Sequence, residues 1–210
     1  MKALVLTTDD LRKELEAYPI NGGLELVWIT EPGLPTHYPE ADTCIDLLFK
    51  NERQHIQWLK QLPVSFIIIN SVITSLAELK ENFIRINGWN TFLKRDTIEA
   101  ACNDDALKIK AEELFTHLGR KTEWVSDIPG FISPRVVASI INEAFITLEE
   151  KISVENEIDV AMKLGTNYPY GPFEWGQKIG LHQVYSLLET LGREQVRYKP
   201  SALLKERSLV

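Results

Sequence analysis

The feature that most constrains the fold is an almost entirely apolar run at residues 64–69, Val-Ser-Phe-Ile-Ile-Ile. Such a strand is typical of a parallel sheet that is covered by helices on both faces. Helical patterns flank this run, and the alternation of strands with helices predicts a parallel α/β sheet. The chain therefore begins with an α/β domain.

Other segments of the first half extend this alternation. We expect strands at residues 3–6, 24–30, 43–49, 64–69, 83–86 and 122–125, and helices at residues 11–18, 52–62 and 106–118. Residues 98–100 fit either a short strand or a helical piece. Strand and helix alternate up to about residue 126.

The pattern changes after that point. Ser133 and Pro134 are typical of a helix cap and a first helical position, and apolar residues recur at helical spacing up to residue 149. Two more helices are expected at residues 158–164 and 181–191, with an aromatic, glycine-rich loop at 168–176 between them. We predict a Rossmann-like α/β domain with a parallel sheet at residues 1–126 and an all-α domain at residues 127–210.

Composition excludes several classes of protein. The chain has 210 residues, a formal net charge of −7 and no long cluster of Lys or Arg, which argues against a nucleic-acid partner. No stretch approaches the roughly 20 apolar residues of a membrane span, and the start does not resemble a secretion signal. Cys44 and Cys102 lack metal-binding spacing. We expect a cytoplasmic protein with buried thiols, without membrane or metal.

Several motifs of the second half occur in a specific order: Asp-Ile-Pro-Gly-Phe-Ile at 127–132, Asn-Glu-Ala at 142–144, Ile-Asp at 158–159 and Gly-Pro-Phe-Glu at 171–174. This order resembles the C-terminal domain of the 3-hydroxyacyl-CoA dehydrogenases, a helical domain of the 6-phosphogluconate dehydrogenase C-terminal-like type. A weaker similarity extends upstream. The resemblance implies NAD-dependent oxidation of 3-hydroxyacyl-CoA in fatty acid metabolism, a Rossmann domain for NAD, and a homodimer formed by the helical domain.

The resemblance also implies a glycine-rich turn that holds the cofactor's pyrophosphate. Thr7, Thr8 and Asp9 occupy this turn here, and it contains no glycine. We expect Thr8 or Asp9 to cap the following helix instead, and we expect no NAD binding. Glu31 lies where a ribose-binding acid belongs, although an ordinary surface-loop acid is the favoured interpretation.

The family's general base is a histidine in a Gly-x-His-Phe-Phe turn. Residues 88–92 match this turn and place Asn90 at the histidine, but asparagine cannot accept a proton near neutral pH. After a deletion of about three residues, Glu99 matches the carboxylate that orients the histidine. An exposed helix acid is an equal interpretation of Glu99. The family's serine and asparagine near the nicotinamide correspond to Asn70 and Ser71 or to Ser71 and Val72, depending on the gap, and at most one polar group survives there.

No histidine of this chain is an obvious replacement for the base. His37 falls in a Pro-rich loop, and His55, His117 and His182 fall on predicted helices. We expect structural or surface roles for all four.

In the helical domain, Ser133 and Arg135 are the candidate substrate-binding residues, while Pro134 replaces the family's asparagine. The second half also contains a group of aromatic residues: Phe131, Tyr170, Phe173 and Trp175. These side chains either line an acyl or CoA pocket or pack between helices and across a dimer interface, and we favour packing.

Three hypotheses follow. The first is a catalytically impaired, homodimeric pseudoenzyme of this family. The second is an active oxidoreductase whose altered site contains Ser71, Asn90 and Glu99. The third is a non-catalytic module that binds an acyl-CoA-like ligand.

Overall fold

The computed structural model describes residues 1–30, 38 and 40–209. These form two compact units, Met1–Phe131 and Ile132–Val210, so the division falls slightly after the predicted boundary at residue 126. The expectations for Glu31 and His37 lie outside the described residues. The first unit is α/β and the second is helical.

The α/β unit contains a seven-stranded sheet in the order β2-β1-β3-β4-β5-β6-β7. Its strands are β1 (Lys2–Leu6), β2 (Glu25–Ile29), β3 (Thr43–Asp46), β4 (Phe66–Asn70), β5 (Ile84–Ile86), β6 (Thr97–Ala101) and β7 (Lys121–Trp124). Strand β4 is the apolar run predicted from the sequence, and its isoleucines are buried. The central strand is thus confirmed.

One strand pair departs from the predicted parallel sheet. Strands β5 and β6 run antiparallel, with Arg85 opposite Ala101, while the other paired strands are parallel. The short connection between them explains this, because a parallel crossover needs a dozen or more residues and usually a helix. Residues 98–100 therefore belong to a strand and not to a helix.

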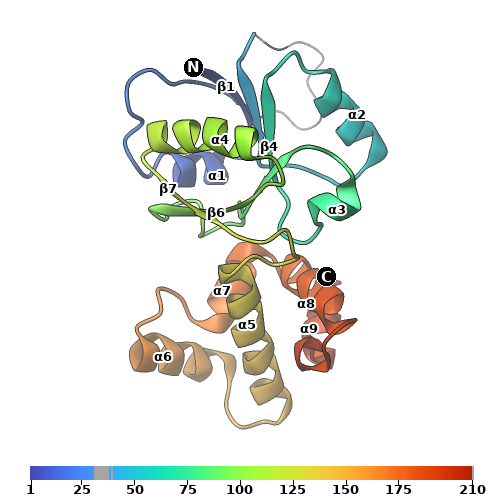
Figure 1. The fold of residues 1–210 in the computed structure, drawn as a ribbon. Coiled ribbons are helices and arrows are strands. Elements are labelled where there is room, and N and C mark those ends of the chain that lie inside the picture. Colours follow the sequence, from blue (N-terminus) through green and yellow to red (C-terminus); the bar gives the residue numbers. More distant parts are fainter. Residues whose placement is uncertain (31–37, 39, 210) are drawn as a thin grey trace. The chain divides into compact units, whose positions relative to one another are not determined.

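Helices cover both faces of the sheet (Figure 1). Helices α1 (Asp9–Leu15) and α4 (Asp105–His117) share one apolar core with β1 and β5, which includes Leu15, Ile84 and Phe115. Helices α2 (Arg53–Gln61) and α3 (Leu76–Leu79) share the other core with the opposite side of the strands. Alternating strand residues supply the two cores because successive side chains point to opposite faces.

The second unit consists of helices α5 (Ser133–Glu149), α6 (Glu155–Thr166), α7 (Pro172–Ile179), α8 (Leu181–Gly192), η1 (Val196–Tyr198) and α9 (Ala202–Arg207). Two predictions about it were wrong. Ser133 is inside α5 and Ile132 is the N-cap residue. Much of the predicted loop at 168–176 is helix α7, since Pro172 is suited to a first helical turn.

No helix in the described part of the chain is both long enough and apolar enough to cross a membrane.

Candidate functional site

The turn between β1 and α1 lies at the carboxyl edge of the sheet, where doubly wound folds bind dinucleotides. Thr7 is fully buried, and its backbone N–H donates to the Ile29 carbonyl over 3.0 Å. The Thr8 hydroxyl accepts a hydrogen bond from the Leu11 backbone N–H over 3.3 Å. Thr8 is therefore the helix cap, and its side chain satisfies an amide of the first turn.

Two carboxylates occupy the first turn of α1, where a pyrophosphate would need backbone N–H groups. They belong to Asp9 and Asp10, and Asp10 is 3.5 Å from the Lys13 ammonium. A carboxylate at about 4 Å from a phosphate charge repels it by about 1 kcal/mol in water and about 4 kcal/mol near a protein surface. These residues do not fit a pyrophosphate.

At the same edge, Asn70 joins the turns that follow β3 and β5. Its side-chain amide donates to the carbonyls of Leu47 and Gly88, both over 3.2 Å, and its oxygen accepts from the Gly88 N–H over 3.0 Å. A Cβ atom on Gly88 would lie 2.7 Å from the Asn70 side chain, so this contact needs a glycine. All of Asn70's side-chain hydrogen-bonding groups thus have partners within the protein.

Ser71 follows directly and is also occupied internally. Its hydroxyl donates to the Thr74 carbonyl over 2.9 Å, and its own carbonyl accepts from Arg85. The side chain is 6% exposed. In this structure, the Ser71 hydroxyl stabilises its own turn.

The structure brings Glu99 together with Asn87, which is not among the candidate residues predicted from the sequence. The Asn87 side-chain amide donates to the Glu99 carboxylate over 3.1 Å, and the Asn87 backbone N–H donates to the Glu99 carbonyl. Both side chains are buried, at 4% and 9% exposure. Glu99 lies on strand β6, so its interpretation as an exposed helix acid was wrong.

The Asn87–Glu99 pair also changes the match to the histidine turn. The match of Asn90 to the histidine requires a deletion of about three residues before Glu99. Without that deletion, Asn87 matches the histidine of the Gly-x-His-Phe-Phe turn, and Arg85 matches its glycine. Asn90, the sequence-based candidate, is half-buried in the turn that follows. The spacing of 12 residues between Asn87 and Glu99 was the signal in the sequence that could have found the pair.

Arg95 faces the same carboxylate. Burial lowers the pKa of the Arg95 guanidinium, while the charge of Glu99 raises it. The guanidinium also lies 4.3 Å from the centre of the Phe92 ring. The site therefore contains an amide, a carboxylate and a cation, and the amide of Asn87 cannot accept a proton near neutral pH.

His55 is buried and hydrogen-bonded within the α/β unit. It is 6% exposed, its Nε2 lies 2.6 Å from the Asp46 carboxylate, and its Nδ1 lies 3.4 Å from the Lys50 backbone N–H. Both ring nitrogens are thus engaged. His117 is half-buried at the end of α4 and His182 is exposed on α8.

In the helical unit, Arg135 of α5 contacts the segment after α8. Its Nη1 is 3.5 Å from the Tyr198 hydroxyl, and its guanidinium is 5.5 Å from the centre of that ring. Arg197 donates to the same hydroxyl over 2.8 Å. Ser133, the other substrate-binding candidate, is half-buried in the first turn of α5.

The aromatic candidates pack within their own units. Phe173 meets Phe145 at 5.0 Å between ring centres, and Tyr170 meets Trp175 at 5.9 Å. Phe173 and Trp175 are both 4% exposed, while Phe131 belongs to the α/β unit. Packing between α5 and α7 therefore accounts for Phe173, while Trp175 packs against the segment that precedes α7.

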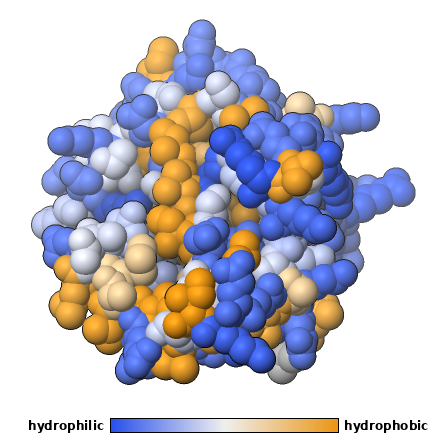
Figure 2. All heavy atoms as spheres, turned by 90° about the horizontal axis from the view of Figure 1, so that it is seen from below, coloured by the Kyte–Doolittle hydropathy of each residue, from blue (hydrophilic) through white to orange (hydrophobic). Residues whose placement is uncertain are grey.

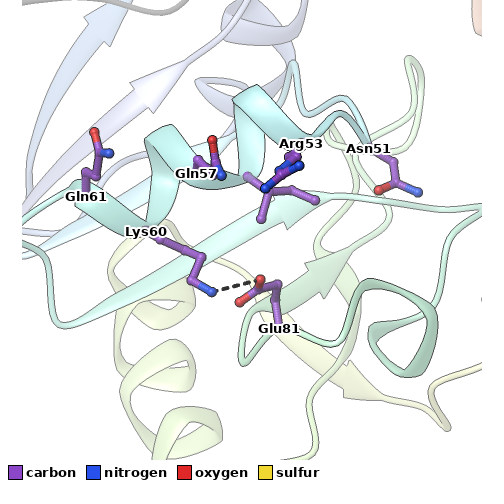
Figure 3. A pocket seen from close by; sticks show the side chains of 7 residues that line it. Asn51, Arg53, Gln57, Lys60, Gln61 and Glu81 are labelled. Atoms are coloured by element: carbon purple, nitrogen blue, oxygen red, sulfur yellow. Dashed lines mark hydrogen bonds and ion pairs between the residues drawn. The ribbon is translucent and has the colours of Figure 1, made fainter.

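A surface hollow of about 710 Å³ lies beside α2 (Figure 3). Figure 3 shows the Lys60 ammonium pointing to the Glu81 carboxylate, 3.0 Å away, while Gln57 and Gln61 project from the same helix. Neither a buried polar group nor a candidate residue of the sequence analysis lines it. Among the described residues, no group of His, Cys, Asp and Glu is arranged to hold a metal ion.

Comparison with known proteins agrees with this architecture. Residues 130–208 match the family model described as 3-hydroxyacyl-CoA dehydrogenase, C-terminal domain. The 3-hydroxyadipyl-CoA dehydrogenase of Escherichia coli K12 is 41% identical over 113 residues, which is 53% of this chain and 24% of that protein. The 3-hydroxybutyryl-CoA dehydrogenase of Bradyrhizobium diazoefficiens is 35% identical over 140 residues, which is 63% of this chain and 48% of that protein.

Solved structures show the same relationship. The 3-hydroxybutyryl-CoA dehydrogenase of Escherichia coli K12 matches with a TM-score of 0.60 and 32% identity, over 68% of this chain and 31% of that one. The (S)-3-hydroxybutyryl-CoA dehydrogenase of Ralstonia eutropha shares the fold, with a TM-score of 0.75 and 22% identity, over 98% of this chain and 92% of that one. Against the two curated relatives, this chain spans half of the length or less. The chain belongs to the 3-hydroxyacyl-CoA dehydrogenase family.

Proposed function

We propose that this chain is a member of the family that does not oxidise 3-hydroxyacyl-CoA with NAD, and is therefore a pseudoenzyme related to fatty acid metabolism. The observation that carries the proposal is the hydrogen bond from Asn87 to Glu99, because an amide stands where a proton acceptor is needed. General base catalysis contributes about 10²- to 10⁴-fold to rate, so its loss alone removes much of the activity.

The β1–α1 turn supports the same proposal independently. Thr8 satisfies the Leu11 amide, and Asp9 and Asp10 place negative charge where the pyrophosphate would lie. A cofactor that cannot approach the backbone there gains neither the amide hydrogen bonds nor the favourable end of the helix dipole. Loss of the base and loss of the phosphate turn affect two separate steps, the proton transfer and the binding of cofactor.

Calorimetry with NAD and NADH tests the binding half of the proposal, and a steady-state assay with several 3-hydroxyacyl-CoAs tests the catalytic half. The 3-hydroxybutyryl-CoA dehydrogenase of Escherichia coli K12 serves as the positive control. We expect no heat of binding for NAD or NADH, and no turnover above the rate measured without enzyme. Micromolar NAD affinity would overturn the first half, and turnover that disappears in a Glu99→Ala variant would establish the altered active site instead.

We also propose that the protein forms a homodimer through its helical unit in the cytoplasm. The support is apolar surface: Ile132, Val136 and Leu164 are 52%, 53% and 82% exposed. On the face drawn in Figure 2, apolar groups reach the surface among polar ones. Two free, buried cysteines suit a reducing compartment. Light scattering at micromolar concentration tests the dimer, and a strict monomer would refute it.

A non-catalytic acyl-CoA-binding module is the second candidate function. The observation that favours it is a partly exposed group on α7 and the preceding segment, where Tyr168 and Tyr170 pack against Trp175 and the Lys178 ammonium lies 5.0 Å from the centre of the Tyr170 ring. A ligand at 100 times its dissociation constant stabilises a protein by about 2.7 kcal/mol. Acyl-CoA should then raise the melting temperature, and a Tyr170→Ala variant should lose that rise.

A further inference from the structure

One arginine of the α/β unit lies completely inside it. Arg85, in the middle of β5, is 0% exposed. Its Nε donates to the Ser71 carbonyl over 2.9 Å, its Nη2 donates to the Val72 carbonyl over 3.2 Å, and its Nη1 forms an ion pair with Asp127. Each nitrogen of the guanidinium thus has a partner, and these partners come from two segments distant in sequence.

The segment at residues 127–131, Asp-Ile-Pro-Gly-Phe, is the last part of the α/β unit, and we call it the strap. Arg85 contacts both of its ends, because the guanidinium also lies 4.9 Å from the centre of the Phe131 ring. The Gly130 N–H donates to the Val72 carbonyl over 2.8 Å. The strap is therefore held against the turn that follows β4.

The Asp127 carboxylate has a second role. It accepts hydrogen bonds from the backbone N–H groups of Leu76 and Ala77, at 2.9 and 3.0 Å, in the first turn of α3. Glu78 adds a further negative charge near Arg85. One ion pair consequently connects β5, α3 and the strap.

The strap has a backbone that needs such support. Phe131 has a φ of 46°, in the left-handed region that side chains other than glycine rarely adopt, and Gly130 has a φ of 91°. Left-handed conformations of non-glycine residues cost free energy and persist only when neighbouring contacts hold them. The contact between Arg85 and Phe131 supplies one of these.

A purely structural ion pair is the alternative explanation. Buried ion pairs are often no more stabilising than apolar residues of similar volume, so they are weak as a source of stability, and their best-supported use is to specify one conformation. The alignment on Glu99 puts a glycine of the family turn at position 85, and a glycine has no side chain to reach a strap. The contact with the strap therefore depends on the arginine side chain at position 85.

We propose that Arg85 is a built-in lock that keeps the strap in one conformation without any ligand. The strap directly precedes the helical unit in the sequence, so the lock fixes where the α/β unit ends. The effect of Arg85 on the strap does not depend on whether NAD binds, because the contacts of Arg85 are all within the protein.

Hydrogen–deuterium exchange on the full chain tests this lock. In Arg85→Met, the amides of Ile128, Gly130 and Phe131 should exchange about 10- to 100-fold faster, while those of β1 and β3 stay protected. Arg120→Met is the matched control, since Arg120 is 4% exposed and donates to the carbonyls of Leu15, Leu93 and Leu118. It should leave exchange in the strap unchanged.

Unchanged strap exchange in Arg85→Met would overturn the proposal, as would equal acceleration by Arg120→Met. If Arg85→Met does not fold, Arg85→Lys provides the test, because lysine keeps the charge but lacks the planar fork of donors. It should accelerate strap exchange to a smaller extent. In the wild type, millimolar NAD or acetoacetyl-CoA should leave strap exchange unaltered, and protection induced by either ligand would show that a ligand, not Arg85, controls the strap.

Discussion

The side-chain amide of Asn87 donates to the carboxylate of Glu99 over 3.1 Å inside the α/β unit. The pair couples the end of β5 to β6, and Arg95 contributes a positive charge to the same carboxylate. Glu99 thus remains next to the residue that takes the histidine's place, but that residue has no basic nitrogen. The Asn87 amide can hold a polar group by hydrogen bonding, but it cannot take a proton from one near neutral pH.

Replacing Asn87 with histidine restores the imidazole beside Glu99. We expect Asn87→His to fold and to show no turnover with NAD and a 3-hydroxyacyl-CoA, because the β1–α1 turn still lacks a phosphate-binding backbone. A spectrophotometric assay of NADH formation provides the measurement. Asn90→His is the control for an imidazole in the neighbouring turn. Turnover in Asn87→His alone would mean that NAD binds despite the altered turn.

Glu14 should make stability depend on pH. Burial raises the pKa of this carboxyl, and the Thr91 N–H, which donates to it over 2.6 Å, lowers it to a smaller extent. A carboxyl with a raised pKa in the folded state binds its proton more tightly there, so its contribution to stability is lost as the pH rises through the folded pKa. The unfolding free energy of Glu14→Gln, relative to wild type, should therefore increase from acidic to neutral pH.

Urea titrations at several pH values measure this difference. Glu16→Gln is the control, because Glu16 is an exposed residue of the same helical region. The difference in unfolding free energy between Glu14→Gln and wild type could instead be constant with pH or fall toward neutral pH. Either result would contradict a raised pKa of Glu14 in the folded state.

Asp159 should stabilise the start of α7. Its carboxylate accepts from the backbone N–H groups of Phe173 and Glu174, over 2.8 and 3.0 Å. Because loss of a helix cap costs about 0.5–2 kcal/mol, we expect Asp159→Ala to lower the unfolding free energy by about that amount. Asp159→Asn, which keeps an acceptor oxygen, should lose less. Equal losses for the two variants would show that the cap is unimportant.

The glycine next to this cap gives a separate prediction. A Cβ atom on Gly171 would lie 2.2 Å from the Asp159 side chain, which is closer than side chains tolerate. Gly171→Ala should therefore destabilise the helical unit. Gly165→Ala is the matched control, since an added Cβ meets nothing within 4 Å there and the residue lies in α6. Thermal unfolding of both variants measures the difference, and equal melting temperatures would refute the steric argument.

The proposed dimer interface can be disrupted by a charge. Val136 on α5 is 53% exposed in the single chain, and Val136→Glu should convert a dimer to a monomer without unfolding it. The reason is that an unpaired charge is costly to bury at an interface. Ile109→Glu is the control, because Ile109 is 69% exposed on α4 of the other unit. Analytical ultracentrifugation compares the two, and a Val136→Glu dimer would exclude this surface from the interface.

Features determined by neighbouring residues were predictable. The apolar run that became β4, the cap at Thr8 and the helical repeat of α5 each depend on a few adjacent positions. The absence of glycine from the β1–α1 turn was visible in the same way. The direction of β6 was not, because strand propensity carries no information about which neighbour a strand pairs with.

The sequence alone determined the alternation of strands and helices over most of the first half, the change from α/β to helical character, and the family resemblance in the motifs of the helical half. Only the tertiary structure showed that Glu99 pairs with Asn87 and that Arg85 reaches Asp127, because contacts between residues 12 and 42 positions apart depend on strand register and packing. It also placed α7 in a segment that had the composition of a loop, since the Asp159 cap that stabilises its first turn comes from another helix. Local patterns select the elements, whereas long-range hydrogen bonds decide which side chains share a site.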